Sequence, residues 1–210
     1  MAISITMFFI ASIAGRLSAE SQFYAPKVPE KSYSLIIDGT ATLVGKWTCG
    51  GDAKVETRND WAAGPVAGGN TEMLMVVVTA SVPAIECGDS KMNEHLKRAL
   101  KTEDFPEIRY QAKNYTLVDD GDAVQSSGEL TIAGVTRPVG LGAKLIRLPG
   151  GSMRVVGQVE VNMLDYEVKP PRLFFGVLKV ADTVLVSFDT VVSLTDDVTR
   201  SLFSNHPRSN

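Results

Sequence analysis

Apolar and polar side chains alternate through most of the chain, and this period of two is typical of β-strands with one buried face. The alternation is clearest in residues 108–113 and 139–145, where every second side chain is apolar or small. Turn-forming sequences such as Asp38-Gly39 and Pro149-Gly150-Gly151 separate the alternating segments. The pattern predicts about eight strands joined mostly by hairpins, in an all-β fold that forms either a closed antiparallel barrel or two packed sheets.

A helical period appears in one segment, residues 87–110. Asp89 or Ser90 can cap its first turn, and Pro106 prevents continuation because proline lacks an amide hydrogen. We therefore expect one short helix that covers an open end of the β-structure, either as a plain cap or as a lid over a cavity. Four apolar side chains share one helical face: Met92, Leu96, Ala99 and Leu100.

The chain divides into four predicted regions. Residues 1–19 contain an apolar run and a small-residue cleavage site at Leu17-Ser18-Ala19, without a basic residue before the run. We expect a signal peptide there, or an uncleaved anchor, and hence a periplasmic or secreted protein. Residues 20–32 form a flexible lead-in, residues 33–194 the β-domain, and residues 195–210 a polar disordered tail.

Two cysteines, Cys49 and Cys87, are the only ones in the sequence. In an exported chain, two cysteines most simply form one disulfide. The alternative is a pair of buried thiols. A catalytic thiol is not expected, because no base is suggested near either residue.

Composition and charge exclude several classes of function. The net charge is −3 and no basic stripe with interleaved aromatic residues occurs, so nucleic acid is not an expected partner. The two histidines, His95 and His206, belong to no metal-ligand cluster, so we expect no metal. Neither nucleophile nor acid–base motifs are evident, and we expect that the protein is not an enzyme.

Four segments, in order, resemble the YceI-like family, the polyisoprenoid-binding proteins of bacterial envelopes. The resemblance covers about residues 33–194. The segments are GTATLVGKWTC (39–49), KMNEHLKRALKTEDFPEIRY (91–110), GELTIAGVTRPV (128–139) and LDYEVKPPRLFFGVLKVADTVLVSFD (164–189).

This resemblance implies a lipocalin-like antiparallel β-barrel with an apolar tunnel for an isoprenoid chain, export to the periplasm and no catalytic residues. The expected partner is then an isoprenoid lipid of the quinone or polyprenyl phosphate type, with no other cofactor. Transient membrane contact and a monomeric or homodimeric state are both compatible with the sequence. The competing hypothesis is an envelope structural or interaction protein whose barrel is filled by side chains.

Strand parity predicts which residues line a tunnel, because a closed sheet directs one parity of each strand inward. Trp47 and Phe105 are expected near an opening; the indole of Trp47 and the phenol of Tyr110 each combine an apolar body with a polar tip. The other predicted lining residues are Ile108, Tyr110, Leu130, Ile132, Leu141, Val155, Val159, Val186 and Phe188.

Overall fold

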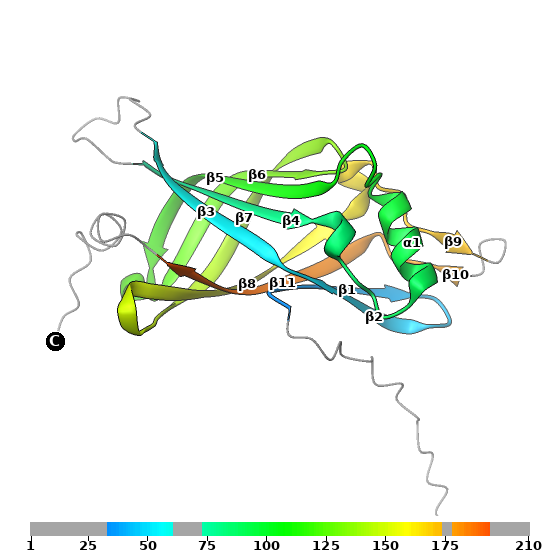
Figure 1. Cartoon of the computed structure of the whole chain (residues 1–210), viewed down its shortest axis with the longest axis horizontal. Coiled ribbons are helices and arrows are strands. Elements are labelled where there is room, and N and C mark those ends of the chain that lie inside the picture. Colours follow the sequence, from blue (N-terminus) through cyan, green and yellow to red (C-terminus); the bar gives the residue numbers. More distant parts are fainter. Residues whose placement is uncertain (1–32, 61–72, 174–177, 194–210) are drawn as a thin grey trace, which may run out of the picture.

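The computed structural model describes residues 33–60, 73–173 and 178–193 (Figure 1). The predictions for the signal peptide, the lead-in to residue 32 and the tail concern residues outside these ranges. Across the described ranges, every helix is too short or too polar to cross a membrane.

Nine antiparallel strands form the main sheet in the order β2-β1-β11-β8-β7-β6-β5-β4-β3, which confirms the predicted all-β antiparallel fold. A separate two-stranded ribbon contains β9 (Arg172–Leu173) and β10 (Leu178–Lys179). The strands of the main sheet are β1 (Leu35–Ala41), β2 (Gly45–Gly51), β3 (Ala53–Asp60), β4 (Met73–Ser81), β5 (Glu107–Val118), β6 (Ala123–Ile132), β7 (Val135–Arg147), β8 (Ser152–Asn162) and β11 (Thr183–Ser193).

The two outermost strands of the sheet, β2 and β3, are consecutive in the chain and separated only by Asp52. β2 pairs with β1 and β3 pairs with β4, so one bent segment supplies both edges and curls the sheet into a barrel. Gly50 and Gly51 precede the bend, and glycines inside a strand often mark a bend or bulge. With β2 and β3 counted as one bent strand, the main sheet has eight strands, in agreement with the predicted number of about eight.

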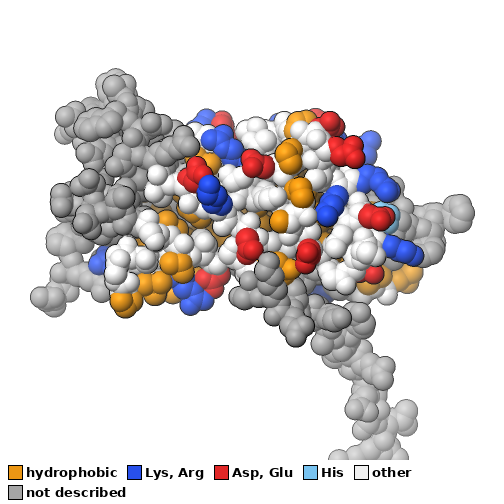
Figure 2. Space-filling view, in the orientation of Figure 1, with side chains coloured by type: hydrophobic (Ala, Val, Ile, Leu, Met, Phe, Trp, Pro, Cys, Tyr) orange, Lys and Arg blue, Asp and Glu red, His pale blue; other side chains and the backbone are white. Residues whose placement is uncertain are grey.

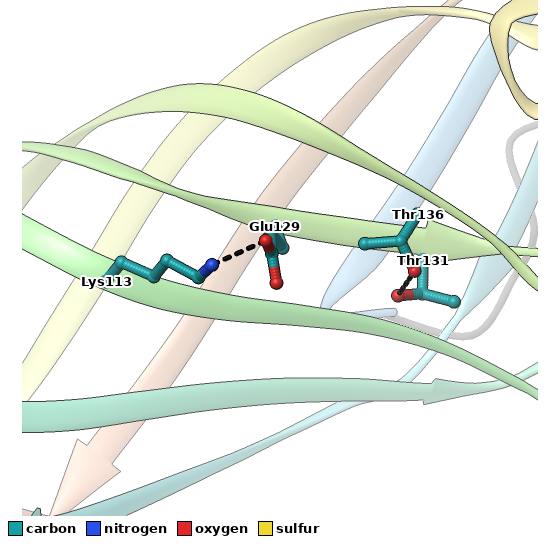
Figure 3. Close-up of polar contacts among 4 residues, drawn as sticks. All are labelled: Lys113, Glu129, Thr131 and Thr136. Atoms are coloured by element: carbon teal, nitrogen blue, oxygen red, sulfur yellow. Dashed lines mark hydrogen bonds and ion pairs between the residues drawn. The ribbon is translucent and has the colours of Figure 1, made fainter.

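Many outward positions on the strands carry polar side chains, as the alternation predicted. Figure 3 shows two cross-strand contacts on this outer face. Lys113 of β5 pairs with Glu129 of β6 at 2.5 Å, and the hydroxyls of Thr131 and Thr136 lie 2.8 Å apart between β6 and β7. Exposed pairs of this kind contribute little stability, and their main effect is to keep this face compatible with water.

Helix α1 (Ser90–Ala99) lies across one end of the barrel (Figure 1). Asp89 is the N-cap, and its Oδ1 accepts a hydrogen bond from the Met92 amide at 2.9 Å. Lys97 and Arg98 occupy the last turn, where positive charge stabilises the helix dipole. Short 3₁₀ helices occur at η1 (Val82–Ala84), η2 (Asp119–Gly121), η3 (Pro149–Gly151) and η4 (Met163–Tyr166).

A disulfide joins Cys49 of β2 to Cys87, two residues before the helix cap, as predicted. Cys49 has no exposed surface. The same region is held by a β-bridge between Gly50 and Glu86 and by a hydrogen bond from the Cys87 amide to Asn93 Oδ1 at 2.7 Å. The entry to α1 is therefore fixed to the barrel wall by both covalent and hydrogen bonds.

An ion pair between Arg154 of β8 and Asp189 of β11 gives a prediction about pH. The Arg154 guanidinium donates hydrogen bonds to both oxygens of Asp189, with Nε 2.7 Å from Oδ1, and lowers the carboxyl pKa below its ordinary value of 3.8. A carboxyl with a lowered folded-state pKa stabilises the fold above its unfolded pKa, and this stabilisation is lost as pH falls through the folded pKa.

We expect Asp189→Asn to lower the free energy of unfolding only slightly at neutral pH, because both side chains are partly exposed. Below about pH 4 the variant should lose less further stability than the parent protein, since the titrating group is gone. Urea unfolding at a series of pH values measures both effects. Glu160→Gln, an exposed change on β8, is the control, and identical acid profiles for all three proteins would contradict the prediction.

Candidate ligand-binding cavity

An elongated cavity of about 670 Å³ occupies the interior of the barrel. Its wall is formed by one side-chain parity from each strand of the main sheet except β5, which contributes both, and nearly all of the lining surface is apolar. Protein interiors are normally packed so closely that voids larger than a water molecule are rare. An apolar cavity of this size lies within the range of about 300–1,000 Å³ that is usual for small-molecule sites.

The wall contains ten of the eleven residues that parity predicted for a tunnel. Their contact with a ligand stays a prediction, since the geometry establishes only their position. The ten are Trp47, Ile108, Tyr110, Leu130, Ile132, Leu141, Val155, Val159, Val186 and Phe188.

Phe105 is the one predicted site residue that does not line the cavity, and its place near an opening stays a prediction. Its side chain is 38% exposed, and its ring lies against Gly134 in the β6–β7 turn. After α1 the backbone turns through Lys101, whose φ is +52°, and the Phe105 amide donates to the Lys101 carbonyl. This turn directs Phe105 to the outside of the barrel before β5 begins.

A β-bulge in β5 adds lining residues that simple alternation misses. The register with β6 shifts between Ala112 and Asn114, so the inward parity changes there. Tyr115 and Leu117 therefore line the cavity along with Ala112, although they differ from it in parity. No local pattern marks the bulge, because both parities of the segment beyond it contain apolar side chains.

Two aromatic rings on the wall lie against glycines of neighbouring strands. A Cβ atom on Gly39 would be 2.1 Å from Cζ2 of Trp47, and one on Gly157 would be 2.4 Å from Cζ of Phe188. Each aromatic residue pairs directly with its glycine in the sheet register. The missing side chains let both rings lie close to the wall, and this helps to keep the bore open.

We expect Gly39→Ala to displace the indole of Trp47 and to reduce the free energy of unfolding by about 1–3 kcal/mol through overpacking. Denaturant titration measures this loss, and a shifted tryptophan emission spectrum reports the displaced ring. Gly142→Ala is the matched control, because a Cβ there has no atom within 4 Å. Equal stabilities and spectra for the two variants would show that Gly39 is not needed for the position of Trp47.

Few polar groups reach the cavity along its middle. The Tyr110 hydroxyl lies 3.0 Å from Ser126 Oγ, which also donates to the Leu141 carbonyl at 3.3 Å. Burial raises the pKa of the Tyr110 hydroxyl above its ordinary value of 10.0, so it is protonated at neutral pH. Trp47 Nε1 is a buried donor for which the described residues provide no acceptor. Unsatisfied buried donors are uncommon and favour a site that a ligand completes.

The ends of the cavity differ in polarity. At the helix end, Asp89, Lys91 and His95 of the α1 region contribute to the lining. At the opposite end, the described residues include a small cluster of buried apolar side chains that contains Leu145 and Met153. A lipid with a polar head would therefore find charged groups at the helix end and apolar contacts along the rest of the bore.

Helix α1 forms part of the cavity wall, although none of its residues was among the lining residues predicted from the sequence. Its apolar face was identified as a packing surface, and that face borders the cavity directly. No residue of α1 is fully buried, although several pack partly against the core. This arrangement agrees with the lid interpretation better than with a densely packed cap. The helical residues on the wall are Lys91, Met92, His95, Leu96 and Ala99, followed by Leu100.

A curled antiparallel sheet around an apolar cavity, with a helix across one end, defines a lipocalin-like barrel. Comparison with known proteins makes the assignment more specific. Residues 31–192 match the YceI-like domain, and the chain belongs to this family.

Individual curated relatives share about a third of the residues over only part of the chain. Protein YceI of Escherichia coli O157:H7 is 31% identical over 101 residues, which cover 45% of this chain and 52% of that protein. The chain thus matches about half the length of its curated relatives.

Among solved structures, BcnA of Burkholderia cenocepacia has a TM-score of 0.58 at 14% identity, covering 75% of this chain and 96% of BcnA. A polyisoprenoid-binding domain from Saccharophagus degradans has a TM-score of 0.56 at 12% identity. The match covers 77% of this chain and 93% of that domain. At these identities the structures support the shared fold.

Proposed function

We propose that this protein binds an isoprenoid lipid inside its barrel and sequesters or carries that lipid in the periplasm. The observation that carries the proposal is the apolar cavity of about 670 Å³ that runs through the barrel. Burial of apolar surface contributes about 25 cal/mol per Å², so a long prenyl tail supplies most of the affinity with few polar contacts. Binding, rather than catalysis, is the role that such a wall supports.

A lipid with one polar end, of the quinone or polyprenyl phosphate type, suits the two different ends of the cavity. The tail would extend between the apolar walls, and the head would lie near Lys91 and His95 at the helix end. The Saccharophagus degradans neighbour is itself a polyisoprenoid-binding domain, which supports the same class of ligand. The Cys49–Cys87 disulfide supports an oxidising compartment such as the periplasm, since cytosolic proteins seldom keep disulfides.

The competing function is an envelope structural or interaction protein with a filled barrel. That hypothesis requires an interior packed at normal density, whereas this barrel has a large open bore. The cavity therefore favours the binding role.

Native mass spectrometry of protein purified from its own cell envelope tests the proposal, because it reports the mass of any retained lipid. We expect a bound species that solvent extraction releases, and rebinding of a long-tailed quinone or polyprenyl phosphate by the emptied protein at micromolar concentration. A protein that repeatedly carries no lipid and binds neither probe would refute the proposal. Short-chain quinones with the same head serve as the control for the contribution of the tail.

A further inference from the structure

The turn between β1 and β2, residues Thr42–Val44, presents apolar side chains to solvent. Leu43 is 81% exposed and Val44 is 51% exposed. Leu43 also has a φ of +70°, a left-handed conformation that leucine rarely adopts and that glycine or asparagine adopts readily. Neither burial nor backbone preference explains a leucine at this position, so its side chain is available for an external contact.

This apolar turn adjoins the helix end of the cavity. Val44 and Trp47 of the same hairpin line the cavity together with Lys91 of α1. Figure 2 shows apolar surface at the lower right of the molecule, below the histidine and neighbouring basic side chains. The exposed turn and the polar end of the bore are therefore parts of one continuous surface.

Positive charges flank the turn. Lys46 follows it in sequence and Lys179 lies beside it in space, and both are exposed. Two hydrogen bonds fix the backbone of Lys179 to Thr42: the Thr42 amide donates to the Lys179 carbonyl at 3.0 Å, and the Lys179 amide donates to Thr42 Oγ1 at 2.8 Å. No aspartate or glutamate occurs between residues 39 and 51. The chain as a whole has a net charge of −3, whereas the only charged residue between positions 39 and 51 is Lys46.

We propose that the β1–β2 turn docks the helix end of the barrel on an anionic phospholipid bilayer. Leu43 and Val44 would enter the boundary between headgroups and acyl chains, while Lys46 and Lys179 contact lipid phosphates. Such docking would place the polar end of the cavity against the membrane surface, where a lipid could pass between bilayer and bore. The proposal depends on the exposed turn and not on the identity of the bound lipid.

Flotation with phosphatidylcholine vesicles, with and without phosphatidylglycerol, tests the proposal. The informative variant is Leu43→Asn, because asparagine tolerates the left-handed conformation and the barrel should stay folded. Ile146→Asn is the matched control: Ile146 is an isomer of leucine, is 44% exposed, and lies on β7 beyond the buried residue Leu145 at the opposite end of the barrel.

We expect the parent protein to float with phosphatidylglycerol vesicles, less so as salt increases, and Leu43→Asn to weaken this binding by about five- to tenfold. Ile146→Asn should bind as the parent does. Absence of binding by the parent, or equal losses in both variants, would overturn the proposal. So would a dimer that Leu43→Asn dissociates in analytical ultracentrifugation without a change in vesicle binding, since the turn would then contact a second copy.

Cargo binding is measured separately, with a long-tailed quinone in detergent solution and no vesicles. Leu43 is outside the cavity wall, so Leu43→Asn should bind the quinone as the parent does. Loss of vesicle docking with retained quinone binding supports this inference, whereas vesicle docking without quinone binding would refute only the proposed cargo.

Discussion

Replacing Ala143 with phenylalanine is expected to abolish lipid binding while the barrel stays folded. Ala143 lies on the cavity wall in β7, opposite Gly157 of β8 and Val124 of β6 in the sheet register. A phenylalanine ring there would occupy bore that the prenyl tail needs. If the ring displaces about 150 Å² of apolar contact, the loss is about 4 kcal/mol, or several hundredfold in affinity.

The control for this substitution is Lys144→Phe, which adds the same ring one position along β7 on the outward face. Lys144 is exposed and outside the cavity wall. Circular dichroism checks the fold of both variants, and titration with a long-tailed quinone measures the affinity. An unfolded Ala143→Phe protein would mean that the interior is already closely packed. A folded variant with full affinity would mean that the ligand binds outside this part of the cavity.

Removing the disulfide is expected to cost about 4 kcal/mol in the free energy of unfolding, from the loop-closure entropy of a 38-residue separation. The variant Cys49→Ala/Cys87→Ala, compared with the oxidised parent in urea, measures this cost. Because the bond anchors the entry to α1, hydrogen exchange in the helix should also accelerate more than in β6 or β7.

Reduction and alkylation of the parent protein is the matched treatment, since it breaks the same bond without mutation. It should reproduce most of the stability loss seen in the double variant. A loss below about 1 kcal/mol in both cases would indicate that the hydrogen bonds around Glu86 and Cys87 hold the helix entry on their own.

Much of the cavity wall could be predicted from sequence because alternation is a local property of a strand. Leu130 and Ile132 face inward on β6, and Val186 and Phe188 face inward on β11, as their parity indicated. Once the sheet closes, the apolar side chains on alternate positions of a strand point to the interior of the barrel. The fold class followed from the same argument applied along the chain.

Other parts of the site depended on tertiary structure that local patterns do not contain. The bulge after Ala112 reverses the parity of β5, and it brings Tyr115 onto the wall. The direction of the chain after α1 depends on how the helix sits on the barrel, and this places Phe105 against Gly134. Whether Met92 and Leu96 face packed core or open bore likewise depends on how much of the interior the strands fill.

The pairing of β1 with β11 bears on how the protein can be made. Leu35 of β1 pairs with Phe188 of β11, so the first strand of the barrel cannot form this pairing until the last strand of the domain has been synthesised. A ribosome-bound chain therefore cannot complete the barrel until almost the whole domain has emerged. Such long-range closure makes folding slow, on the order of milliseconds to seconds. Late closure leaves the nascent chain open for longer, which is compatible with the export to the periplasm proposed above.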